Sequence, residues 1–262
     1  MNVFLRELKF YRKSLIFWSL AMVLLIWSSF VKYDTLQNAG QSITDLMKQF
    51  PATVQTIFGL TGFDLSTQSG FYGVMYMYIA LTVTIHAVLL GAGIISKEER
   101  DKTSEFLFVK PAARSKIITA KLLAGIFSLV VLNIVTLITS IIYFHKNDSF
   151  VTDIYVLMAG MLFMQLVFYF IGAAISAISR RPKLSASMAA GVLLITFIMT
   201  YVINFDKDLD FLKYATPFKY FDAKDILANG HLDGVYIALS LVIVGVMTVL
   251  TYVSYNNRDL EV

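Results

Sequence analysis

The chain has 262 residues, of which 57% are hydrophobic and 15% are charged, and its formal net charge is +4. Soluble domains carry about 25% charged residues. Here the apolar residues also gather in long blocks, which indicates an integral membrane protein with little mass outside the bilayer. The basic residues lie beside these blocks, so the positive charge does not indicate nucleic-acid binding. Cys is absent, which excludes disulfides and thiolate metal sites.

The N-terminal residues 3–13 mix apolar side chains with Arg6, Lys9, Arg12 and Lys13. This pattern predicts an interfacial helix at the level of the lipid headgroups, with the cations reaching outward. The alternative is a plain basic flank to the first membrane span. The apolar run that follows, 15–31, is too long for the core of a signal peptide, and no small-residue cleavage site follows it.

The whole chain, 1–262, is interpreted as a single all-α transmembrane domain. Its apolar segments are each close to the roughly 17–25 residues that cross a bilayer as a helix. There are six of them, at about 14–31, 72–96, 118–144, 154–179, 184–204 and 235–255.

The distribution of Lys and Arg orients these spans. The regions that share a side with the N-terminus hold 15 of these residues, and the other side holds 7. By the positive-inside rule both termini lie in the cytoplasm, as an even number of spans also requires. The protein is therefore expected to be a multi-pass protein of the cell membrane.

Two outer regions show amphipathic patterns. Residues 42–60 repeat apolar side chains at helical spacing around Pro51, and residues 205–234 interleave acids with aromatics. Both predict short outer helices resting on the membrane surface. The acids Asp206, Asp208 and Asp210 lack the Gly and the distal Glu of an EF-hand and are interpreted as a solvated loop, so no metal site is expected.

Small residues recur at four-residue spacing in the fourth and fifth spans, where they would let helix backbones approach closely. The pairs are Gly172 with Ser176, Ala173 with Ala177, and Ser187 with Gly191. Gly91 and Gly93, near the end of the second span, are also interpreted as close-packing positions rather than a flexible joint.

Asn133, Gln165 and His86 are the most polar residues deep in the spans, with His86 as the only ionisable one. They either form hydrogen bonds between helices or line a candidate substrate path. A proton- or sodium-coupled transporter needs an ionisable or cation-coordinating cluster at this depth, and the spans lack one. Any energy for transport must therefore come from elsewhere.

The most unusual stretch is 96–121, between the second and third spans, where seven Lys and Arg surround the apolar run 106–109. Glu98 precedes Lys102 by four residues, which favours a helical turn. A loop that offers large apolar side chains outside the bilayer predicts a surface on which another protein acts. The chain itself contains no phosphate-binding loop and no hydrolase or metalloprotease motif, so it is not expected to be an enzyme.

The same stretch resembles the ABC-2 type permeases, the membrane subunits of bacterial ATP-binding-cassette exporters. The family pattern has an acidic pair, Lys/Gly-Thr, Glu-x-Leu-Leu, Pro, and a Lys that opens the third span. Residues 216–221 and 258–260 fit further parts of the pattern. Two positions depart from the pattern, with Phe108 where a Leu is usual and Ala113 where a Ser is usual. The corresponding residues of this chain are Glu98, Glu99, Lys102, Thr103, Glu105, Phe106, Leu107, Phe108, Pro111, Arg114 and Lys121.

The resemblance implies a half-transporter whose loop 96–121 is a coupling helix. Two permeases, either two copies of this chain or this chain with a paralogue, would dock two cytoplasmic nucleotide-binding subunits, and ATP and Mg would bind there and not to this chain. ATPase coupling is assigned to Glu98, Glu99, Lys102, Thr103, Glu105, Phe106, Leu107, Pro111 and Arg114.

The expected function is export of an amphipathic or hydrophobic cargo, such as a peptide, an antibiotic or a lipid-like compound, because the spans are apolar and rich in aromatics and Met. The alternative is a membrane scaffold or sensor that recruits a cytoplasmic ATPase and transports nothing.

Overall fold

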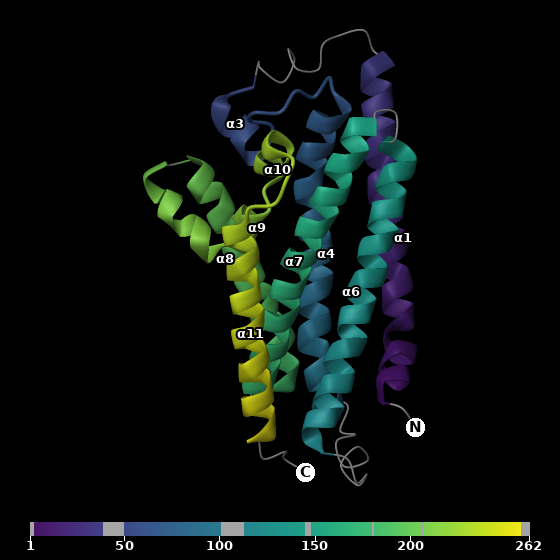
Figure 1. The fold of residues 1–262 in the computed structure, drawn as a ribbon, viewed down its shortest axis with the longest axis vertical. Coiled ribbons are helices and arrows are strands. Elements are labelled where there is room, and N and C mark those ends of the chain that lie inside the picture. Colours follow the sequence, from purple (N-terminus) through teal and green to yellow (C-terminus); the bar gives the residue numbers. More distant parts are fainter. Residues whose placement is uncertain are drawn as a thin grey trace.

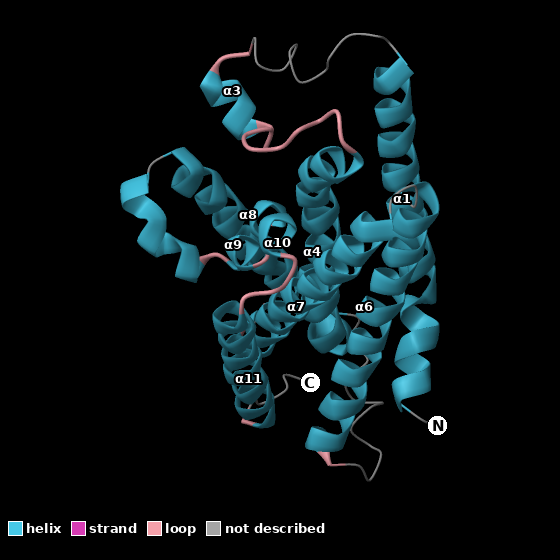
Figure 2. Cartoon of the chain, turned by 45° about the horizontal axis from the view of Figure 1, so that its top comes forward, coloured by secondary structure: helices cyan, strands magenta, loops and turns pink. Residues whose placement is uncertain are grey.

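The computed structural model describes residues 3–38, 50–100, 113–144, 148–179, 181–205 and 207–257, and the described residues form helices and loops only. Figures 1 and 2 show an elongated bundle of long helices with several short ones at one end. In chain order the elements are α1 Val3–Asn38, α3 Ala52–Ile57, α4 Gln68–Arg100, α6 Arg114–Phe144, α7 Asp148–Ile178, α8 Pro182–Phe205, the 3-10 helix η1 Lys207–Ala215, α9 Pro217–Tyr220, α10 Ala223–Asn229 and α11 Gly234–Asn256.

The prediction of six long apolar helices is confirmed. α1, α4, α6, α7, α8 and α11 are each long and apolar enough to cross a membrane. The shortest qualifying stretch, 184–205 in α8, has 22 residues, which at 1.5 Å per residue gives about 33 Å, enough for the hydrocarbon core. The helices also extend past most ends of the apolar segments. α4, for example, begins four residues before the predicted segment 72–96 and ends four residues after it.

The separate interfacial helix predicted for residues 3–13 is not seen as such. α1 is one continuous helix from Val3 to Asn38, so the basic N-terminal residues continue directly into the apolar run. The large apolar side chains of α1 that face away from the bundle, among them Leu5, Phe17 and Leu24, are exposed in the isolated chain. A membrane would cover this face.

The closest helix packing is between α4 and α7, which share the most extensive contact in the bundle. Two glycines make it possible. A Cβ atom added to Gly91 would lie 2.0 Å from the Tyr169 carbonyl oxygen, and one added to Gly172 would lie 2.3 Å from that of Val88. These are the short approaches that small residues allow.

The prediction of close packing is therefore confirmed for Gly91 and Gly172. For Gly191 it is wrong within this chain. A Cβ atom added at this position of α8 would meet no atom within 4 Å, and Ser187 is exposed.

The short helices α3, η1, α9 and α10 lie at the end of the bundle opposite to the start of α1 and the end of α11 (Figure 1). Phe218 of α9 anchors them, since its buried ring lies 5.1 Å from that of Phe168 in α7 and 5.2 Å from that of Phe197 in α8. The Asp222 side chain accepts a hydrogen bond from the Lys224 backbone N–H and caps α10. The short helices predicted for 205–234 are thus present, whereas residues 39–49 lie outside the described part of the chain.

Candidate functional site

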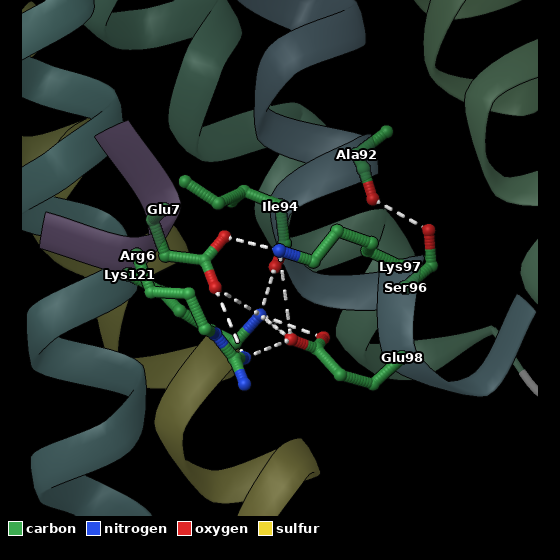
Figure 3. A network of polar contacts seen from close by, with 8 residues as sticks. All are labelled: Arg6, Glu7, Ala92, Ile94, Ser96, Lys97, Glu98 and Lys121. Carbon is green, nitrogen blue, oxygen red and sulfur yellow. Dashed lines mark hydrogen bonds and ion pairs between the residues drawn. The ribbon is translucent and has the colours of Figure 1, made fainter. Parts of the chain in front are cut away.

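Charged side chains from three helices meet at the end of the bundle where α1 begins (Figure 3). Arg6 and Glu7 belong to the first two turns of α1, Lys97 and Glu98 to the last turns of α4, and Lys121 to the first turns of α6. Because α4 runs antiparallel to both α1 and α6, the start of α1, the end of α4 and the start of α6 come to the same level. We call these five residues the ion network.

Lys121 is the central donor of the ion network. Its ammonium nitrogen lies 2.6 Å and 2.7 Å from the two carboxylate oxygens of Glu98 and also donates to the Ile94 carbonyl oxygen at 2.8 Å. The distance from Lys121 Nζ to Glu7 Oε1 is 3.7 Å. Lys121 thereby joins α6 to the last two turns of α4.

Glu7 extends the ion network to α1. Its Oε2 atom accepts a hydrogen bond of 2.6 Å from Lys97, and Arg6 reaches Glu7 Oε1 at 3.3 Å and Glu98 Oε1 at 3.0 Å. The Lys97 ammonium also sits over the Phe10 ring, 4.2 Å from its centre, an arrangement that favours a cation over an aromatic face. Three cations thus surround two carboxylates, and the contacts cross every interface among α1, α4 and α6.

Four of the five residues of the ion network are withdrawn from solvent, and the fifth, Arg6, has a side chain that is 32% exposed. Glu7 and Lys121 are 0% exposed, and Lys97 and Glu98 are nearly as buried. Moving an ion out of water costs several kcal/mol even after relaxation, and this cost is offset only when charges and hydrogen bonds match closely. Removing either carboxylate therefore leaves a buried ammonium without its closest partner, Lys121 in the case of Glu98 and Lys97 in the case of Glu7, whereas the intact network holds the three helix ends in one arrangement.

The ion network lies at the base of the predicted coupling loop. Glu98 is part of it, Glu99 follows in the last turn of α4, and Arg114 opens α6 and donates to the Asn256 carbonyl oxygen of α11 at 3.3 Å. The remaining residues predicted to couple to an ATPase lie outside the described residues, namely Lys102, Thr103, Glu105, Phe106, Leu107 and Pro111. Both described ends of the loop are thus tied to neighbouring helices.

Sequence reasoning missed most of this site. It treated Lys97 and Lys121 as flanks of a loop, named Arg6 only as an interfacial cation, and did not single out Glu7. The statement that His86 is the only ionisable residue in the spans is wrong, because Lys121 lies within the third membrane-spanning helix and is fully buried. A usable signal was present, since Glu7 is the only acid before Asp34 and Lys121 is the only charge in 118–144.

The three polar residues of the candidate substrate path lie on different helix contacts. Asn133 of α6 donates to the Met158 carbonyl oxygen of α7 at 3.2 Å, which is the predicted interhelical hydrogen bond. His86 is buried in α4 with its ring 5.4 Å from that of Trp18. Gln165 of α7 is fully buried. None of the three lines the two main cavities found among the described residues, so a path through them stays a prediction.

Six long apolar helices, with only short helices and loops between them in the described parts, define a multi-pass integral membrane protein. Residues 1–260 match the model of the family described as ABC-2 family transporter protein. The chain belongs to this family, which makes it a membrane component of a transport system that associates with ATP-binding-cassette ATPase subunits. No curated protein sequence matches the chain.

Proposed function

We propose that this chain is the permease of an ATP-driven exporter that moves an amphipathic or hydrophobic cargo out of the cell. ATP and Mg bind to two separate cytoplasmic subunits, and a second permease, identical or related, completes the membrane pore. The chain lies in the plasma membrane of a bacterium with both termini in the cytoplasm, as its distribution of basic residues favours.

The observation that carries this proposal is the position of the ion network. It binds the last turn of α4 to α1 and α6 directly before the loop that the family resemblance assigns to ATPase docking. A displacement of this loop therefore moves three helices together rather than bending the end of one. The apolar side chains Phe106 and Leu107 would supply the docking surface, since burying each contributes roughly 1.5–3 kcal/mol before the costs of association.

The test is to replace Phe106 by Ala and to measure both copurification of the ATPase subunit and its ATP turnover in the reconstituted complex. We expect the variant to reach the membrane in normal amount and to lose docking or turnover. Phe211→Ala is the matched control, because Phe211 is a Phe at the opposite end of the bundle with its side chain largely exposed. If both variants dock, hydrolyse and transport as the parent does, the proposal fails.

The same reconstituted complex distinguishes the exporter from the alternative, a scaffold or sensor that transports nothing. Cargo should stimulate ATP turnover in an exporter. A scaffold shows no such stimulation.

A further inference from the structure

A cavity of about 520 Å³ lies at the end of the bundle opposite to the ion network. α4 and α8 form its sides, and the short helices η1, α9 and α10 with the loop around Gly59 and Thr61 form its outer part. Cavities of this size hold small molecules of a few hundred daltons or part of a larger amphiphile.

Part of the wall of this cavity is apolar. It contains the aromatic rings of Phe63, Phe197, Phe218 and Phe221, together with Met77. Such a wall offers apolar surface for a hydrocarbon segment, and its ring faces also attract cations.

The outer part of the cavity carries charges of both signs. Asp222 pairs with Lys219 at 3.0 Å, and Asp210 pairs with Lys213, which lies just outside the lining, at 2.6 Å. Within each of these two pairs the opposite charges cancel. Lys224 and Asp225 are the two charged residues of the lining that remain.

Lys224 and Asp225 form no ion pair within 4.0 Å among the described residues, although both line the cavity. They are consecutive in α10 and form no ion pair with each other, because consecutive helical residues point in different directions. The Lys224 ammonium lies over Gly62, where an added Cβ atom would approach it to 2.7 Å. Burial, followed by the nearby Asp222, raises the pKa of Asp225, and the charges of Lys219, Lys224 and Lys213 offset only part of this rise.

We propose that this cavity binds a zwitterionic amphiphile of the phospholipid type. Its phosphate pairs with Lys224, its ammonium pairs with Asp225, and its hydrocarbon lies along the aromatic wall. The charges of the lining and of Lys213 sum to zero, and the two that form no ion pair within the described part of the chain, Lys224 and Asp225, have opposite signs, which complements a dipolar head rather than a purely anionic or cationic one. Only the identification of this ligand as the cargo, or as a model of it, rests on the proposed function.

The test is native mass spectrometry of the purified chain in a maltoside detergent, with no ATPase subunit present. The added probes are dioctanoyl phosphatidylcholine, dioctanoyl phosphatidylglycerol and dioctanoylglycerol, which share their tails and differ in head charge, and glycerophosphocholine, which has the head alone. We expect the zwitterionic lipid to bind more tightly than the other three.

The double variant Lys224→Glu with Asp225→Lys reverses the two charges and keeps the net charge. In this variant the lipid head loses two partly exposed ion pairs and faces like charges instead. Its affinity should therefore fall by about tenfold, which corresponds to roughly 1.4 kcal/mol. Ala228→Lys is the control, because it adds a charge to an exposed position of the same helix outside the cavity. It should leave binding unchanged.

Equal binding of all three lipids, or a preference that the charge reversal does not alter, would show general detergent-like association and overturn the proposal. Tight binding of glycerophosphocholine would overturn the role of the apolar wall. Neither result depends on ATPase docking, so a failure here is distinct from a failure of the Phe106→Ala experiment.

Discussion

Replacing Glu98 by Gln should destabilise the protein far more than an ordinary lost ion pair would. In the parent, Glu98 compensates Lys121 through two contacts of 2.6 and 2.7 Å, and Lys121 is 0% exposed. With the carboxylate gone, the nearest acid to this buried ammonium among the described residues is Glu7 at 3.7 Å. Breaking a buried pair by removing one partner costs about 3–5 kcal/mol, and we expect a loss of that order in the free energy of unfolding.

The matched control is Asp210→Asn. Asp210 and Lys213 also lie 2.6 Å apart, but the Asp210 side chain is 59% exposed. Exposed pairs contribute about 0.2–1 kcal/mol, so this variant should change stability little. Unfolding of both variants in mixed micelles with increasing dodecyl sulfate measures the difference. Equal losses for Glu98→Gln and Asp210→Asn would show that burial of the ion pair does not determine the cost of removing its carboxylate.

A second variant separates folding from coupling. Replacing both Glu98 and Lys121 by Met removes one acid and one base, so Arg6, Lys97 and Glu7 keep the network's net charge of +1. Exchanging a buried pair for apolar side chains is often neutral or stabilising. We therefore expect the double variant to regain most of the stability lost in Glu98→Gln while ATP-driven transport stays impaired. Normal transport would show that the ion network serves folding alone.

Two further predictions concern helix packing. Gly91→Ala should destabilise the protein by about 1–3 kcal/mol, because the new methyl group would lie 2.0 Å from the Tyr169 carbonyl oxygen. Gly191→Ala should be neutral or stabilising by up to about 1 kcal/mol, because its methyl group would meet no atom within 4 Å. Thermal unfolding in detergent compares the two, and a Gly91→Ala variant as stable as Gly191→Ala would contradict the close α4–α7 approach. Asn133→Ala should cost about 1 kcal/mol through its lost bond to the Met158 carbonyl; a variant that keeps its stability but loses transport would instead favour the substrate path.

The number and order of the long helices were predictable because a membrane span needs a long apolar run, and such runs are visible in the sequence. Which of those helices pack against one another was not predictable. Gly172 and Gly191 look alike in the sequence, yet one meets the backbone of α4 and the other meets nothing in this chain. Which face of a helix turns inward depends on the whole bundle.

The ion network was hidden for a similar reason. Lys121 and Glu98 lie 23 residues apart, and Glu98 and Arg6 lie 92 apart. Charges near the end of an apolar run usually mark the membrane boundary, so the sequence favoured solvated flanks. The antiparallel arrangement of α1, α4 and α6 brings these charges together and buries them. This arrangement depends on how the helices pack in the bundle, which cannot be read from the residues around each charge.

If the loop between α4 and α6 receives the force of a cytoplasmic ATPase, it must face the cytoplasm and contact the ATPase subunit. The chain contains no Cys, so Leu107→Cys introduces a single thiol that a membrane-impermeant maleimide can report. We expect labelling only from the cytoplasmic side and protection of the thiol when the ATPase subunit is bound. Labelling from the outside, or equal labelling with and without that subunit, would contradict it.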